Sequence, residues 1–254
     1  MAYALAITGG LVVGSFLNVC ITRWPAGESV VSPGSHCRRC QEPVRWYDNV
    51  PLLSYILLGR RCRACKAVIP LRYPMVELAG ATLAAGVVAE GFEPRLALLM
   101  FALGAALIIV TFIDIAHRII PDTITLPSIL IGPGVAFVVG HISVTESLAG
   151  IVVGGGILWL IAVAYERLRS REGMGLGDVK LLAMIGGLLG LKAALFTLLV
   201  SSVVGAVVGL VLMALKRNRL DSEIPFGPFL ALAALVYMFH GAALVAWYFE
   251  RMAV

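Results

Sequence analysis

The chain alternates between long apolar segments and short polar stretches. Eight apolar segments are predicted to form transmembrane helices, at about 3–22, 73–90, 96–114, 124–141, 147–165, 179–190, 193–215 and 226–249. About 20 helical residues are needed to cross roughly 30 Å of hydrocarbon, and most of these segments approach that length. The sixth segment is shorter and rich in glycine. The pattern predicts an all-α polytopic membrane protein of about eight transmembrane helices.

Composition and charge agree with this prediction. Hydrophobic residues make up 60% of the 254 residues, charged residues 14%, and the mean hydropathy is +0.95. A soluble domain carries about 25% charged residues. If the N-terminus lies outside and all eight segments span, only Arg95, Lys192 and Arg251 among the 20 Lys and Arg residues lie outside. The net charge of +5 is then explained by the basic residues of the cytoplasmic loops of a protein embedded in membrane lipid. No nucleic-acid partner is needed to account for it.

Residues 23–72, here called the cysteine module, are polar and basic. They carry two C-x-x-C pairs with 21 residues between them, Cys37 with Cys40 and Cys62 with Cys65. This spacing is typical of a zinc ribbon, in which two knuckles give one structural ion a closed tetrahedral set of thiolates. Two disulfides are the alternative, but the cytoplasmic side is reducing and favours a metal. The fifth cysteine, Cys20, lies in an apolar segment and is expected to be buried.

Two aspartates stand at the ends of predicted helices on the cytoplasmic side. Asp114 ends the third segment, and Asp178 opens the sixth after a glycine-rich stretch. Ionisable groups at membrane depth are costly, which makes both functional candidates. Hydrolysis of a peptide by carboxyl groups requires one base and one acid. Two carboxyl groups that lie close together share one proton, so the pair supplies both. For Asp178 alone, a helix N-cap beside a glycine loop is the competing interpretation.

Five further residues are candidates for supporting the aspartates or binding substrate: Gly175, Gly177, Lys180, Asp122 and Glu77. Gly175 and Gly177 let the backbone bend and a substrate strand approach Asp178. Asp122 begins the fourth segment, where the helix dipole stabilises an acid, and is ranked as supporting rather than catalytic. Glu77 lies just inside the second segment and either pairs with Arg72 or a basic loop residue, or contacts substrate. Small residues such as Gly205 and Gly209 are expected to support helix packing.

These residues resemble those of the bacterial type IV prepilin peptidases, which are aspartyl proteases of the GxGD type. The resemblance covers nearly the whole chain, through Gly14–Arg23, Ser32–Cys37, both cysteine pairs, Asn49–Tyr55, Leu71–Leu78 and the Gly175-x-Gly177-Asp178 motif. It implies a catalytic pair of Asp114 and Asp178, a metal site of the four module cysteines, and a place in the bacterial inner membrane with the active site facing the cytoplasm.

The resemblance also implies the substrates. The family cleaves a short basic leader from type IV prepilins or type II secretion pseudopilins after a glycine, and often methylates the new N-terminus with S-adenosylmethionine. Nothing in the residue spacing indicates methyl transfer or places the methyl-donor site. We expect the basic leader to contact cytoplasmic acids, namely Glu28, Glu42, Asp48 or Asp122.

Two other functions were weighed against leader cleavage. A proton-coupled secondary transporter also uses intramembrane acids, but the chain has no internal repeat relating its halves. A membrane-anchored zinc ribbon that only recruits partners leaves the two aspartates unexplained. The predicted domains are a first transmembrane helix (1–22), the cysteine module (23–72) and a peptidase bundle (73–254).

Overall fold

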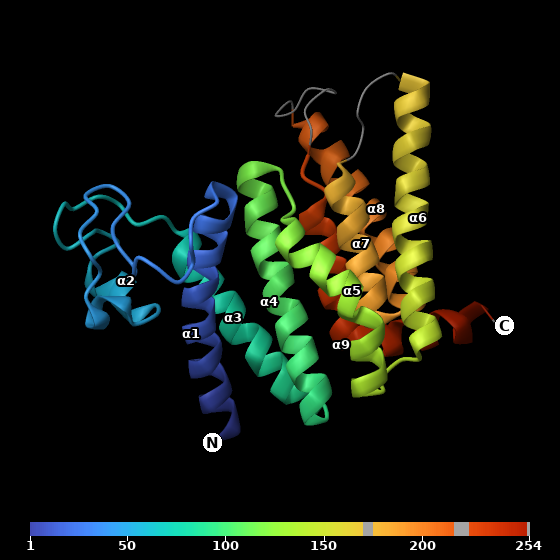
Figure 1. The fold of residues 1–254 in the computed structure, drawn as a ribbon, viewed down its shortest axis with the longest axis horizontal. Helices are drawn as coiled ribbons and strands as arrows, with labels where there is room; N and C mark the ends of the chain where they lie inside the picture. Colours follow the sequence, from blue (N-terminus) through green and yellow to red (C-terminus); the bar gives the residue numbers. More distant parts are fainter. Residues whose placement is uncertain (170–174, 216–223, 253–254) are drawn as a thin grey trace. The chain divides into compact units, whose positions relative to one another are not determined.

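The computed structural model describes residues 1–169, 175–215 and 224–252. Within these ranges every regular element is a helix, and eight long helices match the eight predicted segments (Figure 1). They are α1 (Ala2–Arg23), α3 (Arg72–Ala89), α4 (Pro94–His117), α5 (Asp122–Val139), α6 (Val144–Arg169), α7 (Leu176–Leu189), α8 (Leu191–Ala214) and α9 (Gly227–Met252). The short helices η1 (Trp24–Ala26), η2 (Trp46–Asn49) and α2 (Leu53–Leu57) lie in the cysteine module. The predicted all-α polytopic fold class is confirmed.

The helices differ in how well they suit a membrane. Five helices in the described ranges are long and apolar enough to cross one, namely α1, α4, α5, α6 and α8. In α9 the apolar stretch is the shorter Gly227–Gly241. Helix α7 begins at Leu176, three residues before its predicted start, so Asp178 lies in its first turn. Of the residues used to predict orientation, Arg171, Lys216, Arg217 and Arg219 lie outside the described residues.

The chain divides into two compact units, Met1–Ile113 (unit 1) and Asp114–Val254 (unit 2). The boundary falls inside α4, so the last turn of this helix belongs to unit 2. Asp114 and Asp178 therefore lie in one unit, and the cysteine module lies in the other. The three-part division expected from composition follows a different criterion and stays a prediction.

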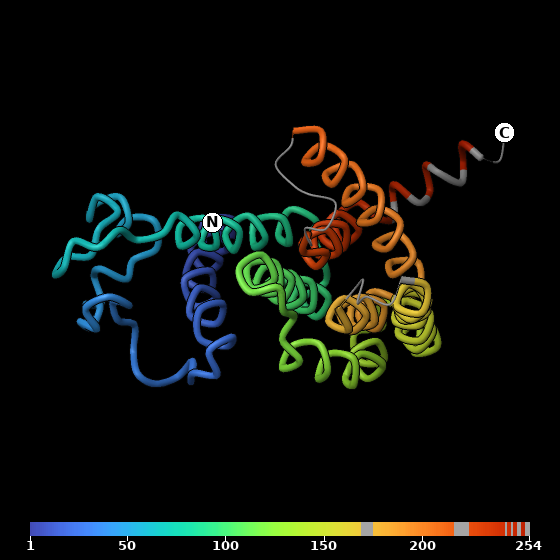
Figure 2. Tube along the Cα trace, turned by 90° about the horizontal axis from the view of Figure 1, so that it is seen from above, coloured from blue at the N-terminus to red at the C-terminus, as the bar shows by residue number. Residues whose placement is uncertain are grey.

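Unit 1 is built on the close packing of α1 against α3 (Figure 2). A Cβ atom on Gly10 would lie 2.5 Å from the Gly80 carbonyl oxygen, and one on Gly14 would lie 2.7 Å from the Glu77 Cα. Only glycine fits at such distances, and small residues are the usual means by which helices approach in membranes. The approach lets the Asn18 side-chain amide donate to the Tyr73 carbonyl oxygen at 3.0 Å.

Unit 2 is built around α7, ten of whose fourteen residues are buried. This helix packs against α5, α6, α8 and α9. Its Gly186 meets Gly150 of α6 so closely that a Cβ atom on either glycine would lie within 2.2 Å of the other's carbonyl oxygen. Gly205 and Gly209, whose small size predicts a role in helix packing, make only ordinary contacts at 3.5 Å or more. The tight helix crossing lies elsewhere.

Candidate active site and metal centre

Asp114 is fixed at the end of α4 by the start of the last helix. Its side chain is 5% exposed. The backbone N–H of Gly227 donates to Asp114 Oδ2 at 3.0 Å. A Cβ atom on Gly227 would lie 2.7 Å from that same oxygen, so only glycine leaves room for the carboxyl group. After Asp114, Arg118 takes a positive φ of 56°, and the chain leaves the helix.

Sequence reasoning missed Gly227. The signal was present in Pro225-Phe226-Gly227-Pro228, where a proline in the first turn marks the start of a helix. The pattern alone, however, predicts only a helix boundary. It does not reveal that Gly227 meets a carboxyl group 113 residues away in the sequence.

Asp178 lies in the first turn of α7 and is 9% exposed. Its backbone N–H donates to the Gly175 carbonyl oxygen at 3.1 Å, and Gly175 takes the N-cap position. The nearby charge that acts on Asp178 is that of Asp114, so the two carboxyl groups lie within electrostatic reach of each other. The structure thus brings the two predicted aspartates near each other within unit 2.

Contact with Ile120 explains why position 177 of the motif is glycine. A Cβ atom on Gly177 would lie 3.0 Å from Ile120 Cβ, and a Cβ atom on Gly227 would lie 3.3 Å from Ile120 Cδ1. The starts of α7 and α9 therefore both pack on Ile120, two residues before α5 begins. Gly175 has open space instead, with its nearest neighbour at 3.8 Å, the backbone nitrogen of Gly177.

Asp122 and Lys180 form an ion pair between the starts of α5 and α7. The Lys180 side chain is 29% exposed and that of Asp122 is 54% exposed. Lys180 lies two residues after Asp178, so the pair ties the first turn of α7 to the segment that follows Asp114. This geometry fits the supporting role predicted for both residues.

Glu77 lies in unit 1, on the face of α3 that meets α1. It is 8% exposed, and its Oε2 accepts the Leu52 backbone N–H at 2.8 Å. Leu52 has a positive φ of 59°, which is unusual for a residue other than glycine. Arg72 donates instead to Thr22 Oγ1 at 2.7 Å. The bond of Glu77 to the Leu52 backbone is thus neither of the two pairings expected from the sequence, with Arg72 or with a basic loop residue.

The cysteine module contains two knuckles of the same construction, offset by 25 residues. In the first, the Cys37 N–H donates to the Glu42 carbonyl, and His36 bridges to Pro43. In the second, the Cys62 N–H donates to the Ala67 carbonyl, and Arg61 bridges to Val68. The residue after the second cysteine of each pair takes a positive φ, 60° at Gln41 and 58° at Lys66. Each knuckle thus turns two sulfurs to the same side.

The four sulfurs form one cluster suited to a metal ion. All four lie within 4.8 Å of one another, and the Cys37 and Cys65 sulfurs are 3.8 Å apart. Tetrahedral zinc with Zn–S bonds of about 2.3 Å places its sulfurs about 3.8 Å apart. All five cysteines are free thiols, and Cys20 is buried as expected. The donor set therefore fits a tetrahedral ion rather than two disulfides.

The surroundings of the two cysteines of the first knuckle shift their pKa values in opposite directions. Backbone N–H groups of Cys40 and Arg39 lower the pKa of Cys37 to about 6. The pKa of Cys40 is raised to about 11. A hydrogen bond from the Glu42 backbone N–H lowers this pKa, but desolvation and the neighbouring cysteines together raise it by more. Four close sulfurs cannot all ionise until a cation neutralises them, so binding of a metal would release protons.

Three of the four acids expected to contact a basic leader already have cationic partners. Arg38 lies 3.3 Å from Glu28, both half-exposed, and Lys180 pairs with Asp122. Arg63 binds Asp48 with two hydrogen bonds of 2.6 and 2.7 Å. A leader would have to displace these partners, which weakens the contact model proposed from the sequence.

Two family models match the chain in succession. The bacterial peptidase A24 N-terminal domain matches residues 8–90, and the type IV leader peptidase family matches residues 101–210. Together they cover well over half of the chain. The chain therefore belongs to the type IV leader peptidase family, as its motifs indicated, and it is a multi-pass membrane peptidase.

Relatives match the chain over almost all of its length. A protein of Burkholderia pseudomallei (strain 1026b) is 39% identical over 95% of this chain and 86% of its own. Proteins of Aeromonas salmonicida (strain A449) and Pseudomonas aeruginosa are 36% and 35% identical, over 98% and 95% of this chain and 94% and 91% of their own. Each is named prepilin leader peptidase/N-methyltransferase. No solved structure matches the chain.

Proposed function

We propose that this chain removes the basic leader from type IV prepilins or type II secretion pseudopilins, cutting after a glycine at the cytoplasmic membrane face. We further propose that it then methylates the new N-terminus with S-adenosylmethionine. Family membership and the names of three relatives support this function. The observation that carries the mechanism is the proximity of Asp114 and Asp178, both buried, within unit 2.

Cleavage proceeds by acid–base chemistry on two carboxyl groups that share a proton. The ionised carboxyl takes a proton from water as the water oxygen attacks the scissile carbonyl carbon. The protonated carboxyl gives its proton to the amide nitrogen as the C–N bond breaks. The Gly227 N–H holds Asp114 in place for this step, and the absence of a side chain at Gly177 lets Ile120 pack against the first turn of α7, which carries Asp178.

The cysteine module serves the second activity in this proposal. Cys37, Cys40, Cys62 and Cys65 would hold zinc, which would order a segment in which Ser54 is the single buried residue among 24–71. The methyl donor supplies an electrophilic methyl group on sulfur. The new N-terminal amine would accept that methyl group and release a proton, and the electrons of the broken C–S bond would stay on sulfur.

The experiment that tests both steps follows the N-terminus of one client protein. A prepilin is incubated with membranes that contain the wild-type chain, Asp114→Asn or Asp178→Asn, and its mature N-terminus is read by mass spectrometry. We expect the wild type to give a cleaved, methylated N-terminus and each variant to lose cleavage by a factor on the order of 10²–10⁴. Cleavage at the wild-type rate in either variant would contradict the catalytic pair.

A further inference from the structure

Unit 1 holds a cavity of about 930 Å³ between the cysteine module and the facing ends of α1 and α3. Cys37 and Cys62 form part of its wall, and so do Asn18, Arg72 and Glu77. A cavity of this size accommodates a small organic molecule of cofactor size. No described residue of unit 2, Asp114 and Asp178 included, contributes to it.

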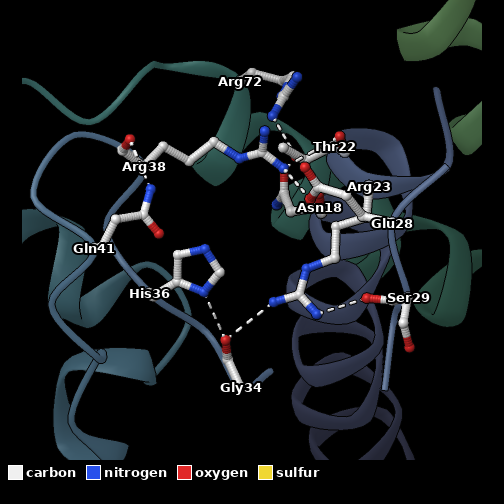
Figure 3. Close-up of polar contacts among 10 residues, drawn as sticks. All are labelled: Asn18, Thr22, Arg23, Glu28, Ser29, Gly34, His36, Arg38, Gln41 and Arg72. Carbon is white, nitrogen blue, oxygen red and sulfur yellow. Dashed lines mark hydrogen bonds and ion pairs between the residues drawn. The ribbon is translucent and has the colours of Figure 1, made fainter. Parts of the chain in front are cut away.

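Several arginines of the wall already donate to other groups, and Figure 3 shows two of them, Arg23 and Arg38. Arg23 donates to the carbonyl oxygens of Ser29 and Gly34, at 2.9 and 3.0 Å. Arg38 donates to the Thr22 carbonyl oxygen and to Glu28. Arg63 is bound by Asp48. Their donors hold the module together and are only partly available to a ligand.

Arg72 is different because it keeps a buried donor without a partner. Its Nη2 donates to Thr22 Oγ1, and its guanidinium lies 5.3 Å from the centre of the Tyr73 ring. Its Nε is buried and has no hydrogen-bond partner. A buried N–H of a cation without an acceptor costs free energy, which a bound carboxylate would recover.

Asn18 and Glu77 offer hydrogen-bond acceptors, whereas Arg72 offers a donor. Asn18 is 2% exposed. Its Nδ2 donates to backbone carbonyl oxygens, and its buried Oδ1 has no hydrogen-bond partner. Glu77, 8% exposed, accepts hydrogen bonds from the Leu52 backbone N–H and the Ser15 side chain, and the described residues show no ion pair to it. The two side chains lie near each other, since Asn18 bonds to Tyr73, one turn before Glu77. Together they present acceptors and a negative charge, which suit an ammonium group.

A carboxylate site and an ammonium site on one wall match the two ends of a free α-amino acid. We propose that this cavity binds the amino-acid end of S-adenosylmethionine, with its carboxylate on Arg72 and its ammonium on Glu77 and Asn18. The nucleoside occupies the rest of the volume, where Tyr55 supplies an aromatic side chain. This assignment rests on the proposed methyl transfer, and it locates the donor beside the metal cluster.

The test measures binding directly, on the full-length zinc-loaded protein in lipid nanodiscs. Equilibrium dialysis compares S-adenosylmethionine with 5′-methylthioadenosine, which keeps the nucleoside and lacks the amino-acid end. We expect wild-type protein to bind S-adenosylmethionine at least tenfold more tightly. Equal affinity for the two ligands would overturn the proposal without the use of any variant.

Variants then locate the site. Glu77→Gln keeps an acceptor for the Leu52 N–H and removes the charge, and Arg72→Gln removes the cation. Each is expected to weaken S-adenosylmethionine at least tenfold while 5′-methylthioadenosine binds as before, which also shows that the cavity is folded. The matched controls are Glu90→Gln, at the far end of α3, and Arg61→Gln, on the module outside the cavity wall. Unchanged S-adenosylmethionine affinity in both site variants would refute the assignment.

Failure of the proposed function has a different signature. If wild-type protein cleaves prepilin yet neither binds S-adenosylmethionine nor yields a methylated N-terminus, methyl transfer itself is wrong and the site assignment falls with it. If wild-type protein methylates its product and the two variants keep full donor affinity, only the location is wrong.

Discussion

The cysteine module and the aspartate end of unit 2 both bring distant residues together, but by different physical means. The module joins two knuckles built from short-range hydrogen bonds, each complete within ten residues. The aspartate end, which comprises Asp114, Ile120, Asp178 and Gly227, is assembled by helices that approach closely where glycine leaves space.

Burial shows the same contrast. Among residues 24–71 of the module only Ser54 is buried, so the module has no hydrophobic core of its own. In α7, which carries Asp178, ten of fourteen residues are buried. A segment without a core needs a ligand to hold one structure, whereas packed helices hold theirs through contacts along their whole length. The two regions should therefore fail under different perturbations.

Removal of the metal is the largest such perturbation. Structural zinc contributes about 10–16 kcal/mol to the folding of small zinc modules, so a chelator should unfold residues 24–71. We expect donor binding and methylation to be lost while prepilin cleavage continues, as measured by mass spectrometry of the client N-terminus. Cys37→Ser should behave in the same way, and Cys20→Ser, which alters a cysteine outside the cluster, should keep its metal. Loss of cleavage in parallel with methylation would break the contrast.

Substitution of Gly227 should affect the other region alone. In Gly227→Ala the new Cβ would lie 2.7 Å from Asp114 Oδ2 and displace the carboxyl group. A displacement of about 1 Å in a catalytic group can cost on the order of 10²-fold, and we expect a loss of that size in the cleavage rate. Metal content should stay at the wild-type level. Gly134→Ala is the control, because a Cβ atom there meets nothing within 4 Å.

The same contrast explains which features could be predicted from the sequence. Helices follow from apolar runs and the metal cluster from two C-x-x-C pairs, because both depend on residues close together in the chain. Asp114 and Asp178 could be selected because acids are rare in apolar sequence. Their pairing, in contrast, rested on chemical need and family resemblance.

What could not be predicted depends on tertiary packing. Gly10, Gly14, Gly150 and Gly186 make the tight helix contacts, yet nothing in their local sequence sets them apart from Gly205 and Gly209. Similarly, the hydrogen bond from the Leu52 N–H to Glu77 links the module to the second turn of α3. Which partner a buried acid finds depends on how α1, α3 and the module pack, and sequence spacing does not encode that.

A smaller effect is expected from the ion pair at the aspartate end. Asp122→Asn and Lys180→Gln each release the first turn of α7 from the start of α5. Because both side chains are partly exposed, we expect cleavage to fall by less than about tenfold, and less at high salt. The double variant should be no worse than either single one, since both remove the same contact. Additive losses would show that the two residues act separately, for example on substrate.

The smallest effect should come from the ion pair within the module. Arg63 binds Asp48 with two hydrogen bonds and lowers the pKa of that carboxyl group. A depressed pKa means that the pair stabilises the module above the usual carboxyl range and loses its effect only as the pH falls below about 4. Asp48→Asn should therefore weaken zinc binding by about two- to fivefold at every pH from 5 to 8, because a pair whose arginine is half-exposed contributes little beside four thiolates. Zinc affinity measured by competition with a chromophoric chelator checks this. A difference between Asp48→Asn and wild type that changes between pH 5 and 8 would show that Asp48 titrates there, against the arrangement described.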